Sequence, residues 1–124
     1  MAEDKHMRAG LAIAILAATA LRPSFAQAEG YAPIDCAKAR SPSEQTICRN
    51  YALGQQEARL ATLFGVATSL VAMGQRGDIQ DAQRAWLKTR EACANDVACL
   101  AKVYDARIAV LNGVVDGIAK RGPF

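Results

Sequence analysis

The amino-acid sequence predicts an all-α fold, a small disulfide-linked bundle of three main helices preceded by a short helix. Apolar residues recur at helical spacing through most of the chain. No segment alternates apolar and polar residues for long enough to form a strand. The four cysteines, in a chain of only 124 residues, are an even number that suits two disulfide bonds.

Residues 1–26 have the pattern of a secretory signal peptide. Lys5 and Arg8 precede an apolar run of thirteen residues, and small residues follow near Ala26 and Ala28. The run is shorter than the roughly 20 residues that span a bilayer. We therefore expect cleavage after Ala26 or Ala28 and a periplasmic or secreted protein with no stable membrane anchor. An uncleaved anchor is the alternative.

Residues 27–124 are expected to form the mature protein, a single helical domain with an irregular start. Three basic and two acidic residues leave with the signal, so 12 Lys+Arg and 10 Asp+Glu remain, a net charge of +2. This weak charge predicts no strong attraction to nucleic acid or to acidic membranes. The single histidine, His6, lies before this segment, which excludes imidazole catalysis and His-containing metal sites from it. We expect no cofactor and no metal.

The first helices follow an irregular, proline-containing segment over residues 27–40. Ser41-Pro42-Ser43-Glu44 is a capping box with proline at the first helical position, which predicts a helix start. Asn50-Tyr51 marks a bend in the helical segment, and apolar residues at helical spacing continue from there to Val71. A short helix and a long helix are therefore predicted before residue 72.

A turn is predicted at residues 74–77, where two glycines flank Gln-Arg, with Asp78 as the N-cap of the next helix. We expect that helix to bury one face, made of Ile79, Ala82, Trp86 and Cys93.

The last helix is predicted to follow a turn at Ala94-Asn95, with Asp96 as its N-cap. Its apolar positions extend to Val115. Gly113, Gly117 and Gly122-Pro123 predict that its C-terminal end frays.

The four cysteines allow three disulfide pairings. The local pairing, Cys36–Cys48 and Cys93–Cys99, is favoured because each pair flanks a predicted helix boundary. The alternative is a zinc site with four thiolates, but gaps of eleven and five residues do not match the short spacing of such sites.

Two groups of residues resemble a known family. The first is Asp35-Cys36-Ala37-Lys38-Ala39, Ser43-Glu44 and Ile47-Cys48; the second is Gln83, Trp86-Leu87, Arg90, Cys93, Cys99-Leu100, Tyr104, Arg107-Ile108 and Leu111. Together they resemble the small secreted bacterial domain named after the LprI lysozyme inhibitor, from about residue 35 to residue 111. The resemblance implies a helical, disulfide-linked fold and a lysozyme as the protein partner. The chain departs from the family at Ile34, where an aromatic is usual, at Glu57, where Asp is usual, and in lacking an acylation cysteine.

Five residues of the second group form a candidate site. Gln83, Trp86 and Arg90 share one helical face because they lie at i, i+3 and i+7. Tyr104 and Arg107 are expected to meet them from the last helix. One interpretation is a buried cluster that fixes how the helices cross, with Arg90 stacked on Trp86. The other is an exposed patch of the residue types that dominate protein-binding surfaces.

The sequence favours a binding protein over an enzyme, since it contains no phosphate-binding loop, nucleophile elbow or metal motif. Two functions are predicted as alternatives: a lysozyme inhibitor, or a structural or stress-related protein of the cell envelope that binds another partner. In the first, Asp78 and Asp81 are candidates for contact with a basic lysozyme. The simpler interpretation is that both acids complement the dipole of a helix start.

Overall fold

The computed structural model describes residues 33–122. In this range the chain forms four helices and no strand: α1 (Pro42–Arg49), α2 (Tyr51–Leu70), α3 (Met73–Ala92) and α4 (Val97–Ala119). The prediction of an all-α fold, with one short helix before three long ones, is confirmed. The predicted signal peptide over residues 1–26 and both of its cleavage positions lie outside the described residues.

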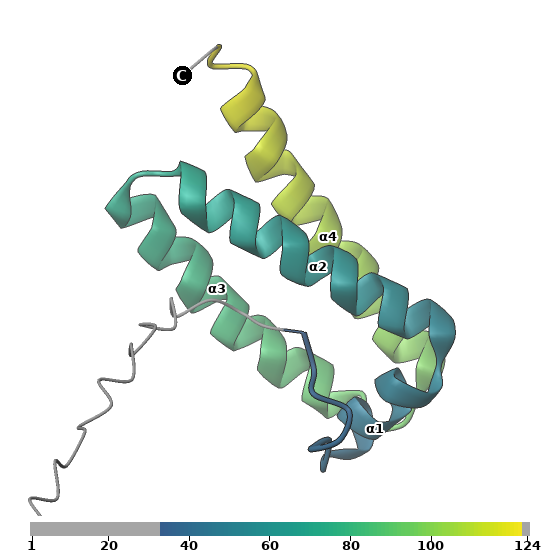
Figure 1. The fold of residues 1–124 in the computed structure, drawn as a ribbon. Coiled ribbons are helices and arrows are strands. Elements are labelled where there is room, and N and C mark those ends of the chain that lie inside the picture. The colour runs from purple at the N-terminus through teal and green to yellow at the C-terminus, as the bar shows by residue number, and fades with distance from the viewer. Residues whose placement is uncertain (1–32, 123–124) are drawn as a thin grey trace, which may run out of the picture.

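Helices α2 and α4 pack along each other at the centre of the bundle, and α3 runs back beside α2 (Figure 1). The short helix α1 contacts both α2 and α3 at the end of the bundle where α2 begins. The core is built from apolar side chains spaced three or four residues apart on the long helices. Its largest fully buried members are Tyr104, Leu53, Leu60, Leu100 and Leu111.

Helix α1 begins at the predicted capping box. The Ser41 hydroxyl accepts a 3.1 Å hydrogen bond from the Glu44 backbone N–H, and the Glu44 carboxylate accepts one from the Ser41 N–H. Asn50 ends α1 and also caps α2, because its side chain accepts a 3.1 Å bond from the Leu53 N–H. One residue therefore makes the bend between the two helices.

The predicted turn at residues 74–77 is wrong. These residues belong to the first turns of α3, which begins at Met73, so Asp78 lies inside the helix and is not its N-cap. The chain turns earlier, through the extended residues Val71 and Ala72. Helical glycine costs only about 1 kcal/mol relative to alanine, and burial of Ile79 one turn later holds this segment in the helix.

Arg76 shows why the chain turns before residue 74. Its Nε donates a 2.7 Å hydrogen bond to the Thr68 carbonyl, and one of its terminal nitrogens lies 3.5 Å from the Val71 carbonyl. The last carbonyls of a helix lack partners within that helix. The Arg76 side chain, from the first turn of α3, supplies hydrogen-bond partners to these carbonyls.

Helix α4 follows the corner that the sequence predicts. Asp96 accepts a 3.0 Å hydrogen bond from the Cys99 N–H, and Ala94 adopts a positive φ of 49° in the preceding turn. The predicted fraying at Gly113 and Gly117 is wrong, because α4 continues through both to Ala119. Ile118, in the last turn, is buried with the core and holds that end down. Within residues 33–122, none of the helices combines the length and apolar character needed to cross a membrane.

Candidate functional site

The five candidate site residues come from the two helices predicted to carry them. Gln83, Trp86 and Arg90 lie on α3, and Tyr104 and Arg107 lie on α4. All five side chains are buried, and Tyr104 has no exposed surface. Ala82, which the sequence placed on the same face as Ile79 and Trp86, is exposed instead, because the buried polar residue Gln83 occupies that face.

Trp86 is the centre of an aromatic contact between α3 and α4. Its ring meets the Tyr104 ring edge to face, with centroids 5.1 Å apart and planes at 67°. Its indole N–H donates a 3.0 Å hydrogen bond to the Val103 carbonyl. The Arg90 guanidinium carbon lies 5.8 Å from the Trp86 ring centroid, within cation–π range. These contacts set where α3 crosses α4.

Arg107 and Gln83 form a second polar contact between the same helices. The Arg107 Nε donates a 2.9 Å hydrogen bond to the Gln83 Oε1, and a terminal nitrogen donates one of 3.2 Å to the Ile79 carbonyl. Burial lowers the pKa of the Arg107 guanidinium. Because an arginine only donates, it fixes the orientation of the Gln83 amide. The Gln83 Nε2 is left buried without a hydrogen-bond partner among the described residues.

Glu57 is the residue of this cluster that sequence reasoning missed as a site residue. It is only 4% exposed on α2. Its Oε2 accepts a 2.5 Å hydrogen bond from the Tyr104 hydroxyl, and its Oε1 accepts one of 3.2 Å from the Ile34 N–H. Burial, together with the Glu57 carboxylate, raises the pKa of Tyr104 well above its ordinary value. One signal was present: Glu57 lies between Leu53 and Leu60 on the apolar face of its helix.

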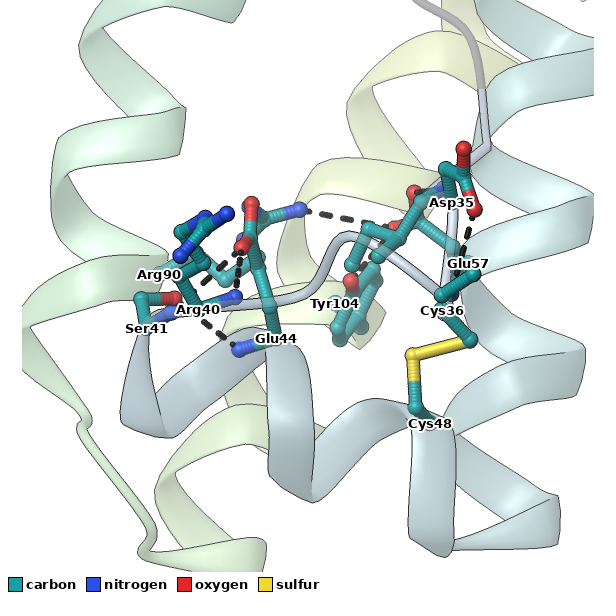
Figure 2. The surroundings of a disulfide bond; sticks show 11 residues. Asp35, Cys36, Arg40, Ser41, Glu44, Cys48, Glu57, Arg90 and Tyr104 are labelled. Atoms are coloured by element: carbon teal, nitrogen blue, oxygen red, sulfur yellow. Dashed lines mark hydrogen bonds and ion pairs between the residues drawn. A yellow bond between two sulfur atoms is a disulfide. The ribbon is translucent and has the colours of Figure 1, made fainter.

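Arg90 connects three carboxylates from different elements, and two of them, Glu44 and Glu57, are labelled in Figure 2. Its guanidinium lies 2.8 Å from Glu91, 3.7 Å from Glu57 on α2 and 3.7 Å from Glu44 on α1. Glu91 is only partly shielded from solvent, and this shielding raises its pKa, but hydrogen bonds from Ser43, Arg90 and Ser41 outweigh it, so the pKa of Glu91 is lowered. The buried arginine thus ties α1 and α2 to α3, and its own charge is compensated on each side.

Both disulfide bonds join the locally paired cysteines. Cys36–Cys48 fastens the segment before α1 to the last turn of α1 (Figure 2). Cys93–Cys99 closes the corner between α3 and α4. The two bonds differ in exposure: Cys36 is exposed, whereas Cys93 is buried in the core.

Asp78 and Asp81 are both exposed on α3, one helical turn apart. Asp81 forms an ion pair with Arg84 on the same helix. They remain an acidic pair on the surface, but on a regular helix and not on a protruding turn.

An open groove of about 310 Å³ lies beside the Cys36–Cys48 disulfide, and apolar surface makes up most of its walls. It runs between the segment before α1, at Pro33 and Ile34, and the start of α2, at Tyr51 and Gly54. Tyr51 is 84% exposed, although it is a large aromatic residue. Sequence reasoning missed this groove because it depends on how the segment before α1 folds back over α2.

These contacts give the cluster around Trp86 a role in holding the helices together. The aromatic pair, the arginines and their acceptors face one another inside the bundle and not the solvent. Within residues 33–122, no three His, Cys, Asp or Glu side chains are grouped so that they could hold a metal ion. The groove and the exposed helix faces are the surfaces that a partner can reach.

Comparison with known proteins identifies one family. The model of the family described as "Lysozyme inhibitor LprI" matches residues 36–113, which include all four cysteines and the cluster around Trp86. Searches of curated proteins and of solved structures found no significant match. The family match covers more than half of the chain. The chain therefore belongs to the LprI lysozyme inhibitor family.

Proposed function

We propose that this protein is an exported, non-enzymatic binding protein that inhibits a lysozyme or a related wall-cleaving glycosidase. The observation that carries the proposal is the family match over residues 36–113. It covers most of the bundle, from the first disulfide to Gly113 in the last third of α4.

The structure is suited to inhibition by occlusion, in which a rigid surface blocks the substrate cleft of the enzyme. Such an inhibitor needs no reactive group, only a surface that keeps its shape. Two disulfides and the buried contacts of Arg90 and Tyr104 supply rigidity at the end of the bundle that contains α1. Arg49 and Tyr51 are exposed at the same end, and arginine and tyrosine commonly anchor protein partners.

The proposed compartment is the periplasm or the exterior of the cell. Disulfide bonds persist in these oxidising environments and are rare in the cytosol, and the chain has two of them. The signal-peptide pattern over residues 1–26, with cleavage after Ala26 or Ala28, supplies the route.

The test is an inhibition assay with the full chain, exported from an expression host and purified without reductant. The protein is titrated into an animal-type lysozyme that acts on a suspension of cell walls. The rate at which the suspension clears should fall to a minimum, reached at about one inhibitor per enzyme. Moderate salt should change this little, because pairs desolvated in an interface are screened less than exposed ones.

Heat-unfolded and reduced protein is the control, and it should not inhibit. If a micromolar excess of the folded protein leaves the lysozyme rate unchanged, the inhibitor function is wrong for this chain. The alternative, an envelope protein that binds a different partner, then takes its place.

A further inference from the structure

The surface beside the groove carries an arrangement of cations and an aromatic ring that the buried cluster does not explain. Four exposed residues, which we name the arginine–tyrosine edge, form it: Arg49, Tyr51, Gln55 and Arg59. Tyr51, Gln55 and Arg59 lie at i, i+4 and i+8 of α2, so they follow one face of that helix. Arg49 is two residues before Tyr51, at the end of α1, and its Cα is at most about 7 Å from that of Tyr51.

The two arginines of the edge, Arg49 and Arg59, form no ion pair within the described residues. By contrast, Lys38 is paired with Asp35, Arg84 is paired with Asp81, and Arg76 is bonded to carbonyls of α2. Both edge arginines are therefore available to carboxylates of a partner.

The groove adds a concave, mostly apolar surface next to these cations. Tyr51 and Gln55 form part of its wall, together with the small residues Gly54 and Ala58. At about 310 Å³ it is at the lower end of the size of ligand sites, enough for one protruding side chain or loop tip of a partner. The exposed Tyr51 ring and the groove beside it give this surface a shape that can be complementary to the rim of a substrate cleft.

The cleft of a lysozyme-type glycosidase has the matching chemistry. Such enzymes hydrolyse a sugar chain with two carboxyl groups that face each other across the substrate. An arginine binds a carboxylate with two parallel hydrogen bonds, and a tyrosine ring can fill the place of a sugar ring. We propose that the arginine–tyrosine edge enters the carboxylate-lined substrate cleft of the glycosidase. This proposal rests on the proposed function and deepens it by naming the surface that binds.

The other two corners of the bundle fit this partner less well. The corner between α2 and α3 exposes the apolar residues Leu70 and Met73, while its arginine, Arg76, is turned back onto α2. The corner between α3 and α4 carries Asp96, which would repel catalytic carboxylates. Only the corner between α1 and α2 combines cations with an exposed ring among the described residues.

The experiment compares matched pairs of full-length variants by their inhibition constants. Arg49→Gln/Arg59→Gln removes the two edge cations, and Lys88→Gln/Lys120→Gln removes two exposed cations elsewhere with the same change of net charge. Tyr51→Ala is matched with Met73→Ala, because the two side chains are 84% and 83% exposed. We expect the inhibition constant to rise about tenfold or more for each edge variant and less than twofold for each control. Circular dichroism and melting temperature verify that all four variants are folded.

A second measurement locates the contact on the enzyme. With a soluble chito-oligosaccharide substrate, an inhibitor seated in the cleft raises the apparent KM and leaves kcat unchanged. Inhibition by the parent protein together with unchanged constants for both edge variants overturns the edge and leaves the proposed function standing. A parent protein that lowers kcat and leaves the apparent KM unchanged also overturns the edge proposal and leaves the proposed function standing. Loss of inhibition only on Asp78→Asn/Asp81→Asn assigns the contact to α3 and overturns the edge. A parent protein that does not inhibit overturns the proposed function and the edge together.

Discussion

The Tyr104 hydroxyl donates a 2.5 Å hydrogen bond to the Glu57 carboxylate in the interior of the bundle, between residues 47 positions apart in the chain. The same carboxylate lies 3.7 Å from the Arg90 guanidinium and accepts the Ile34 N–H. A buried carboxylate is costly unless it is paired and hydrogen-bonded. Glu57 meets both conditions through partners from α3, α4 and the segment before α1. It therefore connects these three elements to α2.

Tyr104→Phe should lower the free energy of unfolding by about 1.5–3 kcal/mol at neutral pH, because it removes a hydrogen bond to a charged group and leaves a buried acceptor short of a donor. Urea unfolding followed by circular dichroism measures this. Tyr51→Phe, at an exposed position, is the matched control and should change stability very little. A Tyr104→Phe variant with the free energy of unfolding of the parent would show that this hydrogen bond makes no net contribution to stability.

Alkaline pH should destabilise the protein through Tyr104. Its pKa is raised in the folded state by burial and by Glu57, whereas in the unfolded chain it returns to about 10. Below the unfolded value both states keep the proton, and the stabilisation is fully present. Above it only the unfolded state ionises, so the free energy of unfolding falls by up to about 1.4 kcal/mol per pH unit.

The measurement is a set of urea curves between about pH 9 and 11, where tyrosine ionises in the unfolded chain. Tyr104→Phe should flatten the alkaline decline relative to the parent. Tyr51→Phe should not, because the exposed Tyr51 ring is in contact with water in both states. Equal slopes in all three proteins would contradict the assignment to Tyr104.

Trp86→Ala should destabilise the protein by about 3–5 kcal/mol, the usual cost of removing a large buried aromatic side chain. It deletes the edge-to-face contact with Tyr104 and the hydrogen bond to Val103. Trp86→Phe should fall between this variant and the parent, because it keeps a ring but loses the N–H. A Trp86→Ala protein that melts like the parent but no longer binds lysozyme would instead make Trp86 a binding residue.

The purified, unreduced protein should contain no reactive thiol after denaturation, since all four cysteines are paired. Replacing either pair by serine should cost about 2–3 kcal/mol by the chain-entropy estimate for short loops. Limiting reductant should first release Cys36 and Cys48, because Cys36 is exposed whereas Cys93 is buried. Alkylation followed by peptide mass spectrometry identifies them. Four thiols, or stoichiometric zinc, in the unreduced protein would refute the disulfide assignment.

The sequence by itself determined the features that depend on residues three or four positions apart. Ser41 and Glu44 predicted the start of α1, and Asp96 predicted the start of α4, because a cap bonds to backbone groups of its own first turn. Asn50 marked the bend for the same reason. The helical class followed from the spacing of apolar residues, which is also a local property.

Only the tertiary structure decided how the polar residues of the core are used. The sequence places Glu57 on an apolar helix face, but the partners that allow a carboxylate to be buried there, Tyr104 and Arg90, come from distant helices. Likewise, two glycines near Arg76 suggested a turn, but the bonds from Arg76 to the end of α2 place the turn earlier. In both cases contacts between helices decide the structure. Local helix propensities, which differ by about 1 kcal/mol per residue, do not override the free energy of these contacts.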